Sequence, residues 1–375
     1  MPLPTRLLGP AACLFAALAA LPAPPARGQD AEPGKAPAPP AKPVPIDADL
    51  PPEREILKEA RSDPRNLKPD TFPVIRSPAY TGVLDAKRMD PEEWVIGTVI
   101  GKTALAFPIN VLNQHEILVD EAEGIPFLVC WCPLCRTGAV HDRRLDGETL
   151  DFGHSGLLFR SSFLLYDAKS RSYWHHVKGR ALTGPMRGKR LAPIPSRFVR
   201  WGAWRAAYPA SKVLAKDPTN LDQTVDSFEP RNKKLKLQWG LGVEAGGEDR
   251  LYELGQLERM PVVQDLLGGV PVVIAYQPAR QLAVAWGRTV EGATLDLRRG
   301  ADSADGLPRL EETGENPSVF DLVSGACVSG PLQGKSLPPV RQCFWEVYAW
   351  TAHHPIGTMF RASVPPPGDL PNVPK

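Results

Sequence analysis

Apolar and polar residues alternate in patterns that predict short strands and helices from residue 94 onward. Trp94–Ala106 alternates around a Gly-Lys pair at positions 101–102, which indicates a β-hairpin. Pro108–Val119 carries apolar residues at positions 109, 112, 117 and 118, a spacing that predicts a short amphipathic helix opened by its proline. Phe127–Trp131 is continuously apolar, and this run predicts a buried strand.

The next stretch of chain has the same character. Thr137–Arg143 and Thr149–Phe152 flank an Asp-Gly turn at positions 146–147, which indicates a second hairpin. Leu157–Tyr166 predicts one further strand, and Phe198–Tyr208 predicts a helix with two tryptophans on one face. Strands outnumber helices, and the pattern of a parallel α/β protein is missing from the sequence. We therefore expect an α+β fold with antiparallel sheets.

The chain contains an internal repeat. Residues 96–152 align without a gap on residues 241–297, an offset of 145, and the match resumes from residue 184 at an offset of 146. An offset that changes by one residue over about a hundred positions indicates duplication. We expect two degenerate copies of a mainly antiparallel β domain with short helices, packed as a pseudo-symmetric pair. Identical pairs include Gly97/Gly242, Asp120/Asp265, Pro126/Pro271, Pro133/Pro278 and Trp204/Trp350.

The N-terminus has the features of a secretory signal. Arg6 supplies a positive charge, Leu7 to Leu21 is almost wholly apolar, and small residues follow at 26 and 28, where a signal peptidase would cut. The apolar run is shorter than the roughly 20 residues that a membrane span needs. We expect residues 1–28 to be removed, no transmembrane span afterwards, and a secreted or periplasmic location.

Composition predicts the remaining boundaries. Residues 29–52 are rich in proline and alanine and predict an extended linker, through which the protein can associate with the cell envelope. We expect the first repeat at 53–230, the second at 231–360 and a proline-rich tail at 361–375. The 44 Lys and Arg are nearly balanced by 42 Asp and Glu, which gives no indication of nucleic-acid binding. We interpret a basic cluster at 231–236 as a solvated connector.

Reactive side chains stand in the first repeat and are replaced in the second. Cys132 and Cys135, spaced as Cys-x-x-Cys after the predicted buried strand, align with Gln277 and Arg280, whereas Pro133 is retained. Such a one-sided loss is expected when one copy of a duplicated fold keeps the chemistry. The sequence therefore predicts a site around the two thiols. Further losses are His115 to Met260, Glu116 to Pro261, Cys130 to Ala275 and His141 to Trp286.

Two thiols at this spacing can bind a metal, exchange disulfides or close a small disulfide. Among the remaining candidate ligands His115 is the first choice, because neighbouring residues on a helix diverge by about 100° and His115 and Glu116 cannot easily face one site. Thiolate and imidazole ligands suit Cu(I) or Zn(II), and no nucleotide cofactor is expected. The residues available to complete a metal shell are His115, Glu116, Cys130, His141 and His154.

The redox state of the cysteines follows from export, which favours oxidation. Five cysteines remain after signal removal, so at least one stays unpaired or binds metal. Cys327 and Cys343, with a Gly-Pro turn between them, can form a structural disulfide. For the Cys-x-x-Cys pair, the nearby Arg136 and His141 are expected to lower a thiol pKa and favour the reactive thiolate.

Other conspicuous residues are interpreted as structural. The pairs His175-His176 and His353-His354 adjoin aromatic residues, and we assign them to the core. Tryptophans that recur at equivalent or neighbouring places in both copies are expected to anchor the core. These are Trp174, Trp201, Trp204, Trp345 and Trp350.

Several motifs resemble a known family. The segments 113–116 (Asn-Gln-His-Glu), 132–135 (Cys-Pro-Leu-Cys) and 152–158 (Phe-Gly-His-Ser-Gly-Leu-Leu) closely resemble the mostly bacterial, exported or membrane-associated family catalogued as domain of unknown function 3179. The resemblance implies a shared fold and a site that includes His115, Glu116, Cys132 and Cys135, and it implies no reaction. Two residues depart from the family pattern: Arg136 replaces the usual glycine, and His154 replaces a usually aliphatic residue.

Three functions stay open at this point, and enzymatic activity and partners stay unassigned. The leading hypothesis is an exported metal-binding protein that uses Cys132, Cys135 and His115 for Cu or Zn. The second is a thiol–disulfide oxidoreductase with Cys132 as the attacking thiolate. The third, in a different class, is a non-catalytic binding module for a cell-surface polymer.

Overall fold

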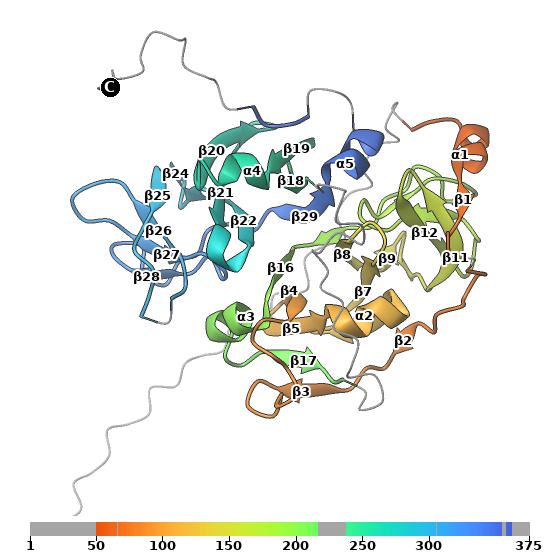
Figure 1. Ribbon diagram of the computed structural model, residues 1–375, viewed down its shortest axis with the longest axis horizontal. Helices are drawn as coiled ribbons and strands as arrows, with labels where there is room; N and C mark the ends of the chain where they lie inside the picture. Colours follow the sequence, from red (N-terminus) through yellow and green to blue (C-terminus); the bar gives the residue numbers. More distant parts are fainter. Residues whose placement is uncertain (1–49, 66, 217–237, 305, 355–357, 362–375) are drawn as a thin grey trace, which may run out of the picture. The chain divides into compact units, whose positions relative to one another are not determined.

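The computed structural model describes residues 50–65, 67–216, 238–304, 306–354 and 358–361. The predicted signal, most of the predicted linker, the basic cluster and nearly all of the predicted tail lie outside the described residues. Within them strands predominate, almost all pairs are antiparallel, and the helices are short (Figure 1). The expectation of a mainly antiparallel β fold is thereby confirmed. No helix in these ranges has the length and apolar character needed to cross a bilayer.

The first half of the described chain forms three five-stranded sheets. One has the order β16-β4-β5-β17-β3, with β3 Tyr80–Gly82, β4 Trp94–Ile100, β5 Thr103–Pro108, β16 Ser196–Arg200 and β17 Lys212–Leu214. The next has the order β15-β8-β7-β6-β2, with β2 Ile75–Arg76, β6 Ile117–Ala122, β7 Ile125–Cys132, β8 Thr137–Asp142 and β15 Pro193–Ile194. The last has the order β1-β11-β12-β13-β14, with β1 Arg61–Ser62, β11 Phe152–Phe159, β12 Ser162–Asp167, β13 Tyr173–His175 and β14 Arg180–Ala181. The remaining elements are the hairpin β9 Arg144–Leu145 with β10 Glu148–Thr149, and helices α1 Glu53–Glu59, α2 Ile109–His115 and α3 Trp201–Ala207.

The second half forms smaller sheets. Two three-stranded sheets have the orders β19-β18-β29 and β20-β21-β22, with β18 Trp239–Ala245, β19 Glu248–Glu253, β20 Val262–Leu267, β21 Val270–Gln277, β22 Leu282–Gly287 and β29 Arg341–Glu346. A four-stranded sheet joins β25 Leu297–Arg299, β26 Arg309–Glu312, β27 Val319–Asp321 and β28 Cys327–Ser329. The remaining elements are the hairpin β23 Thr289–Val290 with β24 Ala293–Thr294, helices α4 Leu254–Leu257 and α5 Val347–His353, and the 3-10 turn η2 Pro278–Arg280.

The same order of elements recurs along the chain. The bounds of β4 to β8 return 145 residues later as β18 to β22, and those of α3 return 146 residues later as α5. One glycine in each half shows why these positions are matched in the sequence. A Cβ on Gly97 would lie 2.3 Å from the Trp204 ring, and a Cβ on Gly242 would lie 2.5 Å from the Trp350 ring. In both places a helix tryptophan packs directly on the strand backbone.

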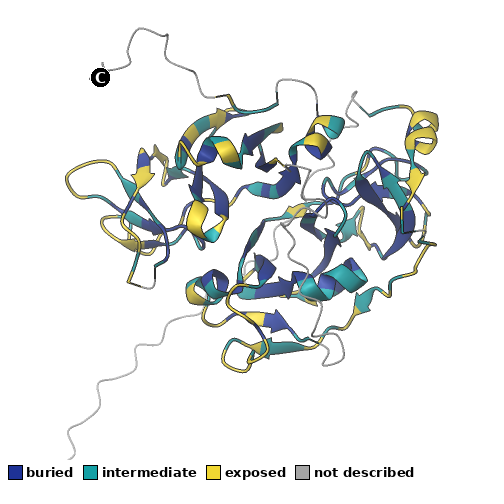
Figure 2. Cartoon of the chain, in the orientation of Figure 1, coloured by how far each residue is buried: buried dark blue, intermediate teal, exposed yellow. Residues whose placement is uncertain are grey.

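Burial separates core strands from exposed elements. The equivalent strands β7 and β21 have no exposed residue, whereas helix α1 is mostly exposed (Figure 2). One cluster of buried apolar residues includes Trp201 and Trp204 from the first half with Trp286 and Phe320 from the second. The prediction that recurrent tryptophans are core residues is confirmed. Trp174, Trp201, Trp204, Trp345 and Trp350 are each 0% to 2% exposed.

Four predicted elements differ from the structure. The helix predicted at Phe198–Tyr208 begins at Trp201, because the residues before it belong to strand β16. The hairpin predicted around the Asp-Gly turn is formed by the short strands β9 and β10, whereas β8 pairs with β7 and β15. The helix predicted to run to Val119 ends at His115, because Glu116 adopts a left-handed conformation with φ 59° and strand β6 begins directly after it. The single strand predicted at Leu157–Tyr166 is instead the hairpin β11–β12. Its two-residue turn places Arg160 and Ser161 at positive φ, 48° and 68°. Neither residue is glycine or asparagine, so the usual sequence signal of such a turn is missing.

Candidate metal centre

The turn after β7 brings the two predicted thiols together. Cys132 is the last residue of β7, and its pairing with Thr137 at the start of β8 closes the turn. The backbone N–H of Cys135 donates to Cys132 Sγ at 3.3 Å, and the N–H of Arg136 donates to the Cys132 carbonyl at 2.6 Å. Arg136 has φ 53°, a left-handed conformation that glycine adopts at little cost. The arginine therefore occupies a glycine-like turn position without opening the turn.

The third member of the cluster is His176, which follows β13. Its Nδ1 lies 3.0 Å from the carbonyl of Phe163. A carbonyl only accepts hydrogen bonds, so Nδ1 carries the proton of the neutral ring and Nε2 keeps a lone pair. Nε2 lies 3.8 Å from Cys135 Sγ. One ring nitrogen of His176 and the sulfurs of Cys132 and Cys135 all lie within 4.8 Å of one another, the one such group of three in the described part of the chain.

Burial determines the charge state of this cluster. Cys132, Cys135 and His176 are each 0% exposed. Burial raises the pKa of the Cys132 thiol well above its ordinary value and lowers the pKa of His176. The expectation that Arg136 and His141 lower a thiol pKa is therefore wrong for Cys132. Desolvation by burial is the largest cause of the raised pKa at Cys132, and His141 is itself uncharged, because burial lowers its pKa to about 3.

Cys130 and His141 act on His176 through its backbone. His141 Nε2 donates to the His176 carbonyl at 2.7 Å, and Cys130 Sγ donates to the same carbonyl at 3.0 Å. Both side chains are fully buried. These two hydrogen bonds hold the backbone of His176 in place. Neither Cys130 nor His141 belongs to the group of converging ligand atoms.

Glu116 and His154 form a pair of their own. His154 Nδ1 accepts from the Gly156 N–H at 2.9 Å, so its Nε2 carries the proton and donates to Glu116 Oε2 at 2.8 Å. The other carboxylate oxygen of Glu116 accepts from Arg65 at 2.8 Å. The Phe163 ring lies against both histidines, with ring centroids 5.1 Å from His154 and 4.4 Å from His176. The Glu116–His154 pair therefore lies behind the Phe163 ring and contacts the cluster through it.

The structure places His115 away from this cluster. His115 is the last residue of α2, and its Nδ1 hydrogen-bonds the carbonyl of Pro73 at 2.8 Å. It is not a member of the converging group. The ligand set that the structure brings together thus contains both predicted cysteines and a different histidine.

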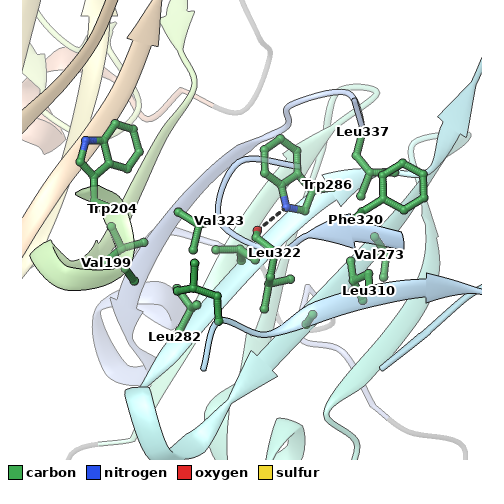
Figure 3. Close-up of a cluster of buried hydrophobic side chains, with 14 of the residues drawn as sticks. Val199, Trp204, Val273, Leu282, Trp286, Leu310, Phe320, Leu322, Val323 and Leu337 are labelled. Atoms are coloured by element: carbon green, nitrogen blue, oxygen red, sulfur yellow. Dashed lines mark hydrogen bonds between the residues drawn. The ribbon is translucent and has the colours of Figure 1, made fainter. Parts of the chain in front are cut away.

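The second half keeps the same turn without the sulfurs. Gln277 Oε1 accepts from the Arg280 N–H at 3.1 Å, in the positions that align with Cys132 and Cys135. Gln281, which aligns with Arg136, also has a positive φ, 49°. Likewise Trp286 Nε1 donates to the Leu322 carbonyl at 2.9 Å (Figure 3), as His141 does to the His176 carbonyl. The backbone arrangement is retained while the polar groups of the cluster are replaced.

Sequence reasoning missed His176, and the signal that could have found it is this alignment. With the offset of 146, His176 corresponds to Leu322, so its imidazole is also lost in the second copy. The sequence interpretation treated the pair at positions 175–176 as structural, so His176 was not among the candidate ligands. His175 itself is buried, and its Nδ1 accepts from the N–H groups of Val177 and Lys178 at 3.2 Å.

The five cysteines of the described residues are all free. Cys343 Sγ donates to the Gly138 carbonyl at 3.1 Å, and Cys327 Sγ donates to the Ser329 carbonyl at 3.2 Å. The disulfide considered between these two cysteines is therefore not formed in this structure.

Comparison with known proteins gives one match. A family model described as "Protein of unknown function (DUF3179)" matches residues 69–226 and 240–365. The two matched segments include all of the cluster and most of both repeats. No curated protein and no solved structure matches the chain.

Proposed function

We propose that this chain, which belongs to the DUF3179 family of proteins of unknown function, binds one thiophilic transition-metal ion through Cys132, Cys135 and His176. The observation that carries the proposal is the convergence of two sulfurs and one imidazole nitrogen within 4.8 Å in a fully buried cluster. His176 takes the place that the sequence hypothesis assigned to His115.

The donor set and its surroundings fit such an ion. Thiolates with imidazole suit Cu(I) or Zn(II), and a zinc ion with three protein ligands would keep its fourth position for water or substrate. The chain supplies the supporting contacts that metal-binding histidines normally have, because the Phe163 carbonyl fixes the His176 tautomer. A bound ion would supply a Lewis-acid or one-electron centre in a fully buried site, according to its identity.

The proposal extends to the setting of the site. We place the protein in the periplasm or outside the cell, on the basis of the signal-like residues 1–28 and the proline-rich linker to residue 52. We further propose that the two halves are copies of one domain, 53–230 and 231–360, packed as a pseudo-symmetric pair with the site in the first. The recurrence of β4 to β8 at one offset supports this.

Thiol–disulfide exchange is the second candidate function, because the same two sulfurs lie close enough to be coupled in one reaction. Full burial and the raised pKa of Cys132 weigh against it, since the attacking species in exchange is an accessible thiolate. A metal ion supplies the positive charge that turns these buried thiols into thiolates, and this favours the metal-binding function.

Elemental analysis of the exported protein, purified without an affinity metal, tests the proposal. We expect about one equivalent of Cu or Zn, which the Cys132→Ser, Cys135→Ser double variant loses. Cys327→Ser is the matched control, because it removes a buried thiol outside the cluster. Absence of metal, with the two cysteines recovered as a disulfide, would favour thiol exchange instead.

A second pair of variants separates the two histidines. His176→Gln should lower metal affinity by about tenfold or more, whereas His115→Gln should leave it within about twofold. The opposite result would restore the ligand set inferred from sequence.

A further inference from the structure

Thr137 lies between two of the proposed ligands. Its side chain is 0% exposed, and its Oγ1 is 2.7 Å from His176 Nε2 and 3.1 Å from Cys135 Sγ. In the second repeat the aligned residue is Leu282, so this hydroxyl is lost together with the ligands. Thr137 therefore belongs to the set of polar groups retained in the first copy.

The hydrogen bonds around this hydroxyl have only one consistent direction in the metal-free protein. The Phe163 carbonyl requires the ring proton of His176 on Nδ1, so Nε2 can only accept. The hydroxyl of Thr137 must then donate its single proton to Nε2. Its oxygen in turn accepts from the thiol of Cys135, which completes a chain from thiol to hydroxyl to imidazole.

A metal ion bound at this cluster would be incompatible with this arrangement, because it would occupy the Nε2 lone pair of His176 and the Thr137 hydroxyl would lose its acceptor. Binding would break two S–H bonds, form two sulfur–metal bonds and release two protons to solvent, without any transfer of electrons. Cys135 would then be a thiolate acceptor instead of a hydrogen-bond donor, and its sulfur would be the acceptor that remains next to the hydroxyl.

We propose that Thr137 is a positioning residue whose hydroxyl proton switches from His176 Nε2 to the Cys135 thiolate when a metal ion binds. This inference rests on the proposed function. In the metal-free state the hydroxyl holds the two ligands at the spacing an ion needs. In the loaded state it stabilises one thiolate by an O–H···S bond and withdraws negative charge from that sulfur.

The test compares Thr137→Val, which removes only the hydroxyl function, with Thr137→Ser, which keeps it. Thr98→Val is the matched control, because Thr98 is also 0% exposed and donates to the Pro195 carbonyl at 2.8 Å, apart from the cluster. Affinities for Zn(II) and Cu(I) are measured by competition with a chromophoric chelator. Co(II) serves as the spectroscopic probe, because its thiolate charge-transfer band reports the electron density on sulfur.

We expect Thr137→Val to lower metal affinity by about tenfold and to move the Co(II)–thiolate band to lower energy, with both restored in Thr137→Ser. An unchanged band in Thr137→Val, or an equal loss in Thr98→Val, would overturn the inference while the metal site stands. A wild-type protein that binds none of the three ions would instead remove the proposed function itself.

Discussion

Acid should destabilise this protein through its buried neutral histidines, and His141 allows the effect to be worked out. The ring is 0% exposed, and burial lowers its pKa to about 3. The cations Arg341 and Arg190 and the ring of His176 lie near enough to contribute to the shift. In the unfolded chain the pKa returns to about 6.5. Between pH 6.5 and pH 3, His141 is therefore protonated in the unfolded state and neutral in the folded state.

The sign and size follow from proton linkage. The stability associated with neutral His141 is fully present above pH 6.5 and is lost as the pH falls toward 3. Between pH 7 and pH 5 a single histidine of this kind lowers the free energy of unfolding by about 2 kcal/mol. Burial also lowers the pKa values of His175, His176 and His353, so the wild-type protein should lose more than this.

The variant His141→Gln isolates the contribution of this one histidine to the pH dependence of the free energy of unfolding. Glutamine keeps an N–H donor for the His176 carbonyl and takes up no proton. Urea unfolding of chelator-treated protein, followed by tryptophan fluorescence at pH 7, 6 and 5, gives the free energy of unfolding for both proteins. We expect the loss between pH 7 and pH 5 to be about 2 kcal/mol smaller in the variant. An equal loss in both proteins would refute the assignment of His141 as a buried neutral ring.

Two further predictions concern packing and buried charge. Gly97→Ala should lower the free energy of unfolding by about 3 kcal/mol, because the added Cβ would meet the Trp204 ring at 2.3 Å. Gly255→Ala, which meets nothing within 4 Å, should change it by less than about 1 kcal/mol, and equal effects in thermal unfolding would contradict the reasoning. Glu116→Gln should cost about 3 kcal/mol in urea unfolding, because it removes the buried carboxylate that accepts from Arg65. A cost below about 1 kcal/mol would show that this pair is not an important support of the fold.

Some elements were predictable because their signals are local. The hairpin around Gly101 and the buried strand ending at Cys132 follow from alternation and from a continuous apolar run. The hairpin β11–β12 was not predictable, because its turn uses Arg160 and Ser161 instead of glycine or asparagine. The end of helix α2 at His115 was not predictable for the same reason. The left-handed residue that ends it is Glu116, and the glycine that usually marks such a position is missing.

By itself the sequence predicted a candidate site in the first half that includes Cys132 and Cys135, because a three-residue spacing in one turn is a local property that does not depend on packing. The alignment of the two halves also predicted backbone positions, such as Gly97 and Gly242, that recur in the structure. Only the tertiary structure decided which imidazole joins the sulfurs. His176 lies 41 residues beyond Cys135 and reaches it through the packing of one sheet on another. His115, much nearer in sequence, lies at the end of helix α2 and hydrogen-bonds the carbonyl of Pro73. Contacts between sheets depend on how whole elements pack, so they cannot be predicted from the spacing of residues along the chain.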